Sequence, residues 1–348
     1  MDPISQAALG AVVAQSVAHH KLGYRAAGIG ALVGAMPDID VFFSIGGDYF
    51  DQLVWHRGIT HSLIFAPVIG PLIAWLVWRW EARASPAPAD RKRLLAWVAA
   101  IVAAIFSHPL LDLLTTYGTQ LLLPFSDARF AINAMPIIDP AYTLTLLGGL
   151  LIAGRFYRTN ARGVALFTLS ISSAYLGYGW YLNDSAEAFV AEQLARENVH
   201  DAKIAAFPTI FQVHYRRVVV RTETEDRVGF VSMWKPCEID WTSASRADSR
   251  LTADFERSRE GGIFKWFAMG WLHYELNPTD TGYQLSAIDL RYGASDNPRE
   301  SMFMSRAQLD SQGSLLSAPT SGGFRPSADQ GSIRRLFDEI YSPSCAQR

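Results

Sequence analysis

Charged residues are scarce in the first half of this 348-residue sequence. Residues 1–182 contain 12 Lys or Arg and 10 Asp or Glu, about 12% of the positions, whereas residues 183–348 contain 19 and 23, about 25%, which is usual for a soluble domain. This contrast excludes a single uniform soluble domain, a disordered chain and a fibrous repeat. The sequence therefore divides into two regions of different character.

Cysteine and excess positive charge are also lacking. Cys237 and Cys345 are the two cysteines, too few for a disulfide framework and without zinc-finger spacing, although one bridge between them stays open. The formal net charge is −2 and there is no basic block, so a nucleic-acid-binding surface is not expected. Asp2 stands where a signal peptide has a basic residue, and no Lys or Arg precedes Lys21, which argues against a cleaved signal peptide.

Long runs without charge occupy much of the first region. A spanning helix needs about 20 mostly apolar residues, because its backbone polar groups must be satisfied internally. A buried soluble helix would explain one such run but not four in close succession. The runs are 59–78, 94–111, 163–182 and the shorter 140–154, preceded by Ala- and Gly-rich segments at 3–18 and 26–37 that favour a tightly packed helix pair. We expect an α-helical membrane domain of about six short or spanning helices over residues 1–182.

Basic residues of the first region gather in three loops, at 21–25, 79–93 and 155–162. The positive-inside rule places such loops in the cytoplasm. Alternation of spans then places the connections 37–60 and 123–140 on the opposite side, together with everything after Leu182. We therefore expect a multi-pass membrane protein with an extracytoplasmic C-terminal domain.

The second region has the composition of a soluble domain. A helical apolar pattern over 185–198 is followed by alternating or β-rich runs with turn signals between them. These runs are 209–222, 228–234, 262–275 and 282–292. We expect a smaller α+β domain over 183–310 with an antiparallel sheet and one helix. Residues 311–348 are rich in Ser, Gly, Pro and Gln, which predicts a flexible tail.

Two polar clusters lie before or at the start of the run 59–78, and ionisable groups at membrane depth are costly enough to suggest a function. In the first, Asp38 and Asp40 form an extended Asp-x-Asp whose carboxylates point to one side and repel unless a cation lies between them. A solvated loop with two acids is the alternative. In the second, His56 and His61 flank an Arg-Gly turn, where Arg57 could grip a phosphate or carboxylate, or be one more interfacial arginine.

Two further clusters lie at a helix interior and a helix start. His108 and Asp112 are spaced i, i+4 and so share a helix face, as metal ligands or as a satisfied structural pair, and Pro109 kinks the helix beside them. Asp139 precedes Pro140 and could simply cap the following helix. Together the four clusters supply three histidines and four carboxylates, the ligand types of hydrolytic zinc, manganese or iron sites. The remaining histidines are expected to be structural: His19, His20, His200, His214 and His273.

These motifs, in this order and spacing, resemble the membrane-bound metal-dependent hydrolase family, also described as LexA-binding, inner-membrane-associated hydrolases. The likeness is specific over residues 1–182 and extends more faintly to about Tyr292. The residues that carry it are Met1-Asp2-Pro3, Ala8-Leu9-Gly10, Pro37-Asp38-Ile39-Asp40, His56-Arg57-Gly58-Ile59-Thr60-His61-Ser62, Ser107-His108-Pro109-Leu110-Leu111-Asp112, Thr115-Thr116-Tyr117-Gly118-Thr119-Gln120 and Asp139-Pro140.

The resemblance implies a protein of the bacterial inner membrane with one or two divalent metal ions, zinc first and manganese or iron as alternatives. The family's metal-binding positions correspond here to Asp38, Asp40, His56, His61, His108 and Asp112. The His-x-x-x-Asp helix is also similar to zinc-dependent phospholipase C sites. One departure concerns residues 5–6, where many members carry Thr-His and this chain has Ser5-Gln6; because an amide is a poorer ligand than imidazole, a full set of metals is in question.

The leading hypothesis is a metal-dependent hydrolase whose activated water attacks an ester or phosphoester of a small-molecule or lipid-like substrate. Arg57 would steady an anionic group of the substrate, and Asp139 would support a ligand or act as base. The alternative is a non-catalytic membrane protein that binds or regulates a partner, with a structural polar or metal cluster. A transporter is less favoured, because the sequence has no paired halves. Partners expected are the lipid bilayer and the substrate, and the sequence predicts no oligomeric state.

Overall fold

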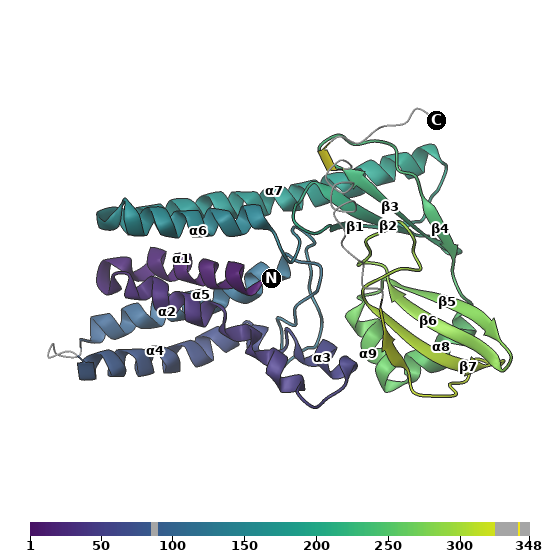
Figure 1. Cartoon of the computed structure of the whole chain (residues 1–348), viewed down its shortest axis with the longest axis horizontal. Coiled ribbons are helices and arrows are strands. Elements are labelled where there is room, and N and C mark those ends of the chain that lie inside the picture. The colour runs from purple at the N-terminus through teal and green to yellow at the C-terminus, as the bar shows by residue number, and fades with distance from the viewer. Residues whose placement is uncertain (85–89, 324–339, 342–348) are drawn as a thin grey trace. The chain divides into compact units, whose positions relative to one another are not determined.

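A computed structural model describes residues 1–84, 90–323 and 340–341 of the chain (Figure 1). The residues separate into two compact units. The first comprises Met1–Gly46, Trp55–Trp180 and Ile210–Gln212. The second comprises Gly47–Val54, Tyr181–Thr209 and Val213–Arg348. Cys345 and most of the predicted tail lie outside the described residues.

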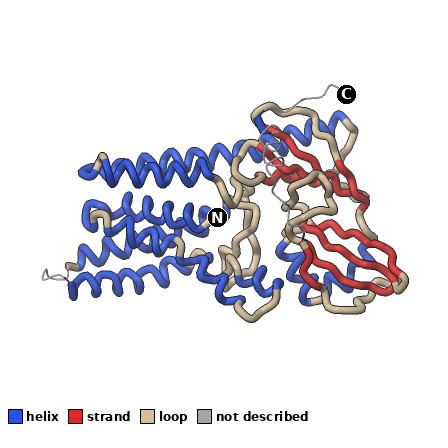
Figure 2. Tube along the Cα trace, viewed as in Figure 1, coloured by secondary structure: helices blue, strands red, loops and turns tan. Residues whose placement is uncertain are grey.

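The first unit is helical, as Figure 2 shows by its blue helices and tan loops. Several of its helices pack side by side, with α1 against α2, α5 and α6, and α4 against α5. Short 3₁₀ helices η1, η2 and η3 interrupt the connections. The bounds are α1 Pro3–Leu22, α2 Arg25–Gly34, η1 Met36–Ser44, η2 Ile59–His61, α4 Phe65–Ala84, α5 Arg91–Leu113, α6 Pro140–Arg155, η3 Arg158–Asn160 and the first part of α7, Ala161–Arg196.

Glycines allow α1 and α2 to approach closely, as the small-residue composition of these segments predicts. A Cβ atom on Gly10 would lie 2.3 Å from the carbonyl oxygen of Gly30 and 2.7 Å from Cα of Gly34. Neither atom belongs to a movable side chain, so a larger residue at these positions would force the two helices apart.

Among the described residues, two segments are long and apolar enough to cross a membrane, Arg25–Ser44 and Arg91–Leu113. A third span is present if the bent pair Tyr49–His61 and Phe65–Arg83, which meets at 64°, counts as one. The uncharged run 163–182, predicted to be a span, forms the first part of α7 but is not among these candidates; its many Ser, Tyr and Gly residues make it less apolar. The side of the membrane that each loop occupies stays a prediction.

The second unit contains two antiparallel four-stranded sheets, in the orders β1-β2-β3-β4 and β5-β6-β7-β8. The antiparallel α+β fold predicted from sequence is confirmed, with two sheets in place of one. The bounds are α3 Tyr49–Trp55, β1 Lys203–Pro208, β2 Tyr215–Arg221, β3 Glu225–Ser232, β4 Thr242–Ser245, α8 Ser249–Arg257, α9 Arg259–Phe267, β5 Leu272–Thr279, β6 Gly282–Asp289, β7 Met304–Asp310 and β8 Thr320–Gly322.

Helix α7 supplies part of the core of the first sheet. Ala186, Val190 and Leu194 recur at helical spacing and pack with Val218 and Val231. The separate helix predicted over 185–198 is therefore the end of α7, which continues through Leu182 to Arg196.

Two further sequence predictions differ from the structure. The segment 262–275, predicted as a strand, is helix α9 followed by β5. Ser258 caps α9 by accepting a hydrogen bond from the Gly261 backbone N–H, and Phe264 and Phe267 are buried on one helix face. Within the predicted tail, Thr320–Gly322 pairs with β7 as strand β8.

Candidate metal centre

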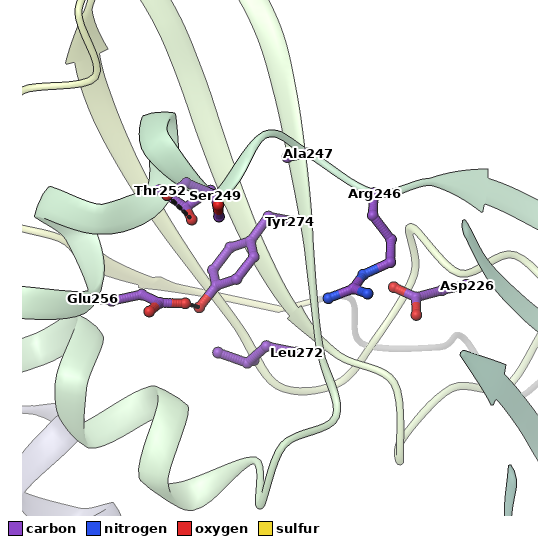
Figure 3. Close-up of a pocket in the computed structure, with 8 residues that line it drawn as sticks. All are labelled: Asp226, Arg246, Ala247, Ser249, Thr252, Glu256, Leu272 and Tyr274. Carbon is purple, nitrogen blue, oxygen red and sulfur yellow. Dashed lines mark hydrogen bonds between the residues drawn. The ribbon is translucent and has the colours of Figure 1, made fainter. Parts of the chain in front are cut away.

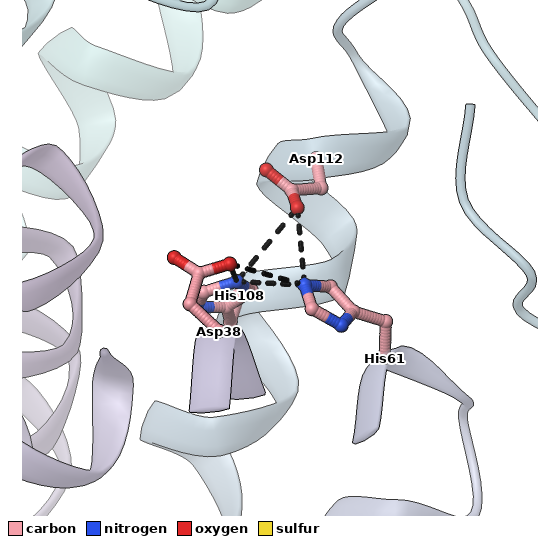
Figure 4. Close-up of side chains that lie close together, drawn as sticks. All are labelled: Asp38, His61, His108 and Asp112. Carbon is pink, nitrogen blue, oxygen red and sulfur yellow. Dashed lines mark hydrogen bonds and ion pairs between the residues drawn. The ribbon is translucent and has the colours of Figure 1, made fainter. Parts of the chain in front are cut away.

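Four side chains from three elements of the first unit converge on one point (Figure 4). Asp38 comes from η1, His61 from η2, and His108 and Asp112 from adjacent turns of α5. The nitrogen Nε2 of His61 lies 3.0 Å from Nε2 of His108, 3.5 Å from Oδ1 of Asp38 and 3.3 Å from Oδ2 of Asp112. His108 Nε2 lies 3.3 Å from Asp38 Oδ1 and 3.7 Å from Asp112 Oδ2. We call these four residues the Asp/His cluster.

Both histidines of the cluster direct Nε2 to its centre and use Nδ1 for a contact outside it. His108 Nδ1 lies 2.6 Å from the carbonyl oxygen of Gly34, and a carbonyl can only accept, so Nδ1 carries the proton. His61 Nδ1 lies 3.0 Å from Oδ2 of Asp40 and donates to it in the same way. If both rings are neutral, two Nε2 lone pairs face each other beside two carboxylates. A cation between them, either a proton on His61 or a metal ion, removes this repulsion.

The spacing of the donor atoms also suits a metal ion. Ligands of a tetrahedral zinc ion at about 2.0 Å lie about 3.3 Å from one another, and the five separations above span 3.0 to 3.7 Å. Three of the residues are buried and Asp38 is partly exposed. The buried Asp/His cluster could therefore hold a metal ion.

Asp40 lies beside the cluster and contacts His61, which belongs to it, and His56, which does not. Its Oδ1 accepts a hydrogen bond from His56 Nδ1 at 2.9 Å, and its Oδ2 accepts from the Arg57 backbone N–H at 2.8 Å and from Thr60 Oγ1 at 3.0 Å. With His61 Nδ1 it has four donors. Asp40, His56 and Asp38 also form a second group of three side chains close enough to share an ion. The number of donors on Asp40 favours its role in holding histidines.

Arg57 is buried and turned toward Asp112. Its Nε lies 2.9 Å from Asp112 Oδ2, and its Nη1 donates to Thr115 Oγ1 at 2.7 Å and to the Asp112 carbonyl at 3.2 Å. The guanidinium also lies 4.9 Å from the ring centre of Tyr117. These contacts pair Arg57 with a cluster carboxylate, so contact with a substrate anion would require this pair to open.

The start of the chain completes the surroundings of Asp112. Gln6 is buried and its Nε2 donates to Asp112 Oδ1 at 3.0 Å, while its Oε1 has no hydrogen-bond partner among the described residues. The amino group of Met1 pairs with the same carboxylate oxygen. Burial is the main reason that the pKa of this amino group is lowered, and the positive charge of Arg57 acts in the same direction. Gln6 thus lies where the resemblance places a histidine, next to the cluster.

Asp139 lies in a different environment, at the start of α6. Its Oδ1 accepts a hydrogen bond from the Tyr142 backbone N–H at 3.0 Å, and its Oδ2 accepts from the Tyr175 hydroxyl at 2.8 Å. It belongs to neither of the two groups that could hold an ion. These contacts correspond to the helix cap that the Asp139-Pro140 pair suggests.

The 3₁₀ helix η1, which supplies Asp38, also carries exposed apolar side chains. On η1, Asp40 is buried and Asp38 is 21% exposed at its side chain, whereas Ile39, Phe42 and Phe43 are about half exposed or more. The cluster also lies toward the C-terminal ends of both candidate spans and at the break of the bent pair. Sequence spacing does not predict that Met1, Thr60 and the Gly34 carbonyl contribute, because these contacts link distant segments.

A small hollow in the second unit has a different chemistry (Figure 3). Its volume is about 90 Å³, and Asp226, Glu256 and Tyr274 are among its lining residues. Burial opposes ionisation of Asp226, but hydrogen bonds from His273 and Arg221 outweigh it and lower the pKa of this carboxyl. The carboxylate is thus already satisfied by protein donors, among them His273.

Comparison with known proteins assigns the chain to a family. The model of the YdjM inner membrane protein family matches residues 1–186, which contain every member of the Asp/His cluster. The chain belongs to this family. Over 282 residues, 76% of each chain, it is 26% identical to the uncharacterized protein YfhP of Bacillus subtilis. Over 103 residues, 29% of this chain and 54% of the other, it is 34% identical to the inner membrane protein YbcI of Escherichia coli. No solved structure matches it.

Family membership confirms the resemblance inferred from the motifs. It also identifies an inner membrane protein in contact with a lipid bilayer, in agreement with the two or three candidate spans. The matched region ends within α7, so the two sheets of the second unit lie beyond it.

Proposed function

We propose that this YdjM-family protein is a membrane-bound hydrolase in which Asp38, His61, His108 and Asp112 hold a divalent metal ion. The observation that carries the proposal is the 3.0 Å approach of two Nε2 atoms whose rings donate through Nδ1 elsewhere. Two imidazoles and two carboxylates suit zinc, with manganese and iron as alternatives. Such an ion would supply Lewis-acid activation of water toward an ester or phosphoester.

The chain's own residues prepare this site in three ways. Asp40 fixes the ring of His61, and the Gly34 carbonyl fixes the ring of His108, so that each keeps Nε2 available. Arg57 holds the carboxylate of Asp112 in place. We assign Asp40 and Arg57 as positioning residues, and we place a second ion, if one binds, at the group of Asp38, Asp40 and His56.

The surface around Asp38 favours a lipid-like substrate. Ile39, Phe42 and Phe43 expose large apolar side chains on the same 3₁₀ helix as Asp38, and a bilayer interface accommodates such side chains more easily than water does. The positive-inside rule, applied to the basic loops at the other end, supports an extracytoplasmic position for this end of the spans. A substrate whose ester lies at the level of the lipid headgroups would reach the partly exposed Asp38 and His56 first.

Metal analysis of the purified full-length protein tests the proposal. The wild type in mild detergent should contain at least one equivalent of a divalent transition metal by elemental analysis. His108→Ala and His61→Ala should lose it, because each removes one of four donors. His20→Ala is the matched control, since His20 is an exposed histidine of α1. A wild type without metal, or a His108→Ala variant that retains it, would overturn the proposal.

Activity is tested separately from metal binding. The metal-loaded protein is assayed against water-soluble and lipid-like esters and phosphoesters, with His61→Ala as the inactive control. Metal binding without turnover, and cellular function retained when His56→Ala and His61→Ala are combined, would favour the alternative of a non-catalytic binding or regulatory protein.

A further inference from the structure

A second cluster of charged side chains lies at the other end of the same helices. The buried carboxylate of Glu81, on α4, accepts hydrogen bonds from Arg25, Arg93 and Trp97. Arg93 binds it through Nε at 2.8 Å and Nη2 at 2.9 Å, and Trp97 Nε1 donates at 2.8 Å. We call these four residues the Glu81 cluster. Trp97 and Asp112 are separated by 15 residues of α5, about 22 Å along the helix.

The charges of this cluster do not cancel, because two arginines share one carboxylate. Arg93 uses its remaining nitrogen, Nη1, to donate to the Lys21 carbonyl at 2.8 Å. Arg25 contacts Glu81 through Nη1 alone, and 69% of its side chain is exposed. The excess positive charge is therefore presented by Arg25, which Glu81 holds in position.

A groove of about 310 Å³ opens directly beside Arg25. Its walls come from α2, α4 and α5, and most of its lining is apolar. Gly28 leaves room there, since a Cβ atom at this position would meet no atom within 4 Å. The lining residues are Arg25, Gly28, Ile29, Val77, Trp80, Trp97 and Glu81, whose carboxylate is bound by Arg25, Arg93 and Trp97. An exposed guanidinium at the mouth of an apolar groove matches a ligand with one anionic group and a hydrocarbon chain.

The position along the spans identifies the source of this ligand. Arg25 begins one candidate span, Arg93 lies near the start of another, and Trp80 lies near the end of the bent pair. Tryptophan and arginine at span ends are located at the level of the lipid headgroups. The segments 21–25 and 79–93 contain seven Lys or Arg and two acidic residues, so the surroundings attract anionic lipid.

We propose that this groove binds one anionic phospholipid, with its phosphate against Arg25 and one acyl chain along Ile29, Val77 and Trp80. The site is separate from the Asp/His cluster, and it does not depend on hydrolase activity. A bound lipid would tie α2 to α4 at the end of the helices opposite the cluster.

Lipid binding to the purified full-length protein tests this proposal. Native mass spectrometry from detergent counts bound phosphatidylglycerol and phosphatidylcholine across a titration. The wild type should bind one phosphatidylglycerol more tightly than phosphatidylcholine. Arg25→Gln should weaken this binding about fivefold, the effect of one basic side chain near a lipid surface. Gly28→Phe should abolish it, because the ring fills the groove.

Two matched variants serve as controls. Gly148→Phe places the same ring on α6, at another glycine with no atom within 4 Å of a Cβ, and Arg158→Gln removes an exposed arginine of another basic loop. Both should bind lipid as the wild type does. Metal content and melting temperature report whether each variant folds, independently of lipid binding.

Three results would overturn the proposal. They are equal binding of the two lipids by the wild type, undiminished phosphatidylglycerol binding by a folded Gly28→Phe, and full displacement of the lipid by an equal concentration of glycerol phosphate. The last result would show that a free phosphate suffices and that no acyl chain occupies the groove.

Discussion

The two ends of the helical unit differ in how they compensate a buried negative charge. Each end buries a carboxylate at a depth where an isolated charge is costly. At one end, Glu81 receives four hydrogen bonds from three donor side chains and needs nothing more. At the other, Nε2 of His61 and Nε2 of His108 lie 3.0 Å apart beside two carboxylates, an arrangement that needs a proton or a metal ion between the two nitrogens. The comparison shows that burial alone does not mark a site; an arrangement that the protein's own groups leave incomplete does.

Removal of metal should give the largest difference between the two ends. A ligand present at about 1,000 times its dissociation constant stabilises a protein by about 4 kcal/mol, so a strong chelator should lower the melting temperature of the wild type markedly. His108→Ala should melt lower from the start and respond little to chelator. A chelator-insensitive wild type that nevertheless contains metal would show that the ion is not bound at the Asp/His cluster.

At the Glu81 cluster, loss of the Glu81 carboxylate should lower the stability of the protein. Glu81→Leu leaves Arg93 and the Trp97 N–H without their acceptor, and uncompensated buried charge costs about 3–5 kcal/mol. Because Arg93 is 35% exposed at its side chain, we expect about 2–3 kcal/mol, measured as a lower melting temperature in detergent. Metal content should stay at the wild-type level. Loss of metal in this variant would mean that the two ends are not independent.

Weakening the support of His61 should give an intermediate effect. Asp40→Asn keeps the shape but removes the charge that holds the Nδ1–H of His61, and such supporting partners typically contribute about 10–100-fold to metal affinity. Competition with a chromogenic chelator measures this change. Asp51→Asn is the control, since Asp51 belongs to α3 and to neither group that could hold an ion. Unchanged affinity in Asp40→Asn would refute the positioning role.

The smallest effect is expected at Asp139. Asp139→Ala removes the cap of α6 and should cost about 1 kcal/mol of stability, read from thermal melts. Metal content and any hydrolase activity should persist, because both carboxylate oxygens are directed to Tyr142 and Tyr175. A variant that folds with full metal but has no activity would restore the catalytic role first considered for Asp139.

The fold class could be predicted from charge and periodicity, and the structure confirms a helical membrane region followed by an antiparallel α+β region. Apolar pattern alone failed at two places. The segment containing Phe264 and Phe267 is apolar enough for a strand, yet Ser258 caps it as a helix. The amphipathic pattern from 185 is the continuation of α7, whose apolar face there packs on the first sheet.

The candidate site was predictable only in part, because sequence spacing reports contacts within one helix but not contacts between distant segments. The i, i+4 spacing of His108 and Asp112 places both on one helix face, and motif order suggested Asp38 and His61 as companions. Their roles as ligands stay predictions. The pairing of Arg57 with Asp112 joins residues 55 positions apart, and no spacing rule reports such a contact. The sequence identifies which side chains could be metal ligands. The fold decides which of them bind a neighbouring protein group and which remain available to bind a metal ion.

The partner of His108 Nδ1 is a backbone oxygen, that of Gly34. No side-chain replacement at Gly34 can delete this acceptor; it can only be displaced, and a Cβ at Gly34 would come within 2.7 Å of Gly10 on α1. The nitrogen of His108 that carries the proton is thus determined by the position of the Gly34 carbonyl, which depends on the close packing of Gly34 against Gly10 on α1. Lateral pressure or bilayer thickness that altered this contact would act on the chemistry of the histidine without touching any residue of the Asp/His cluster.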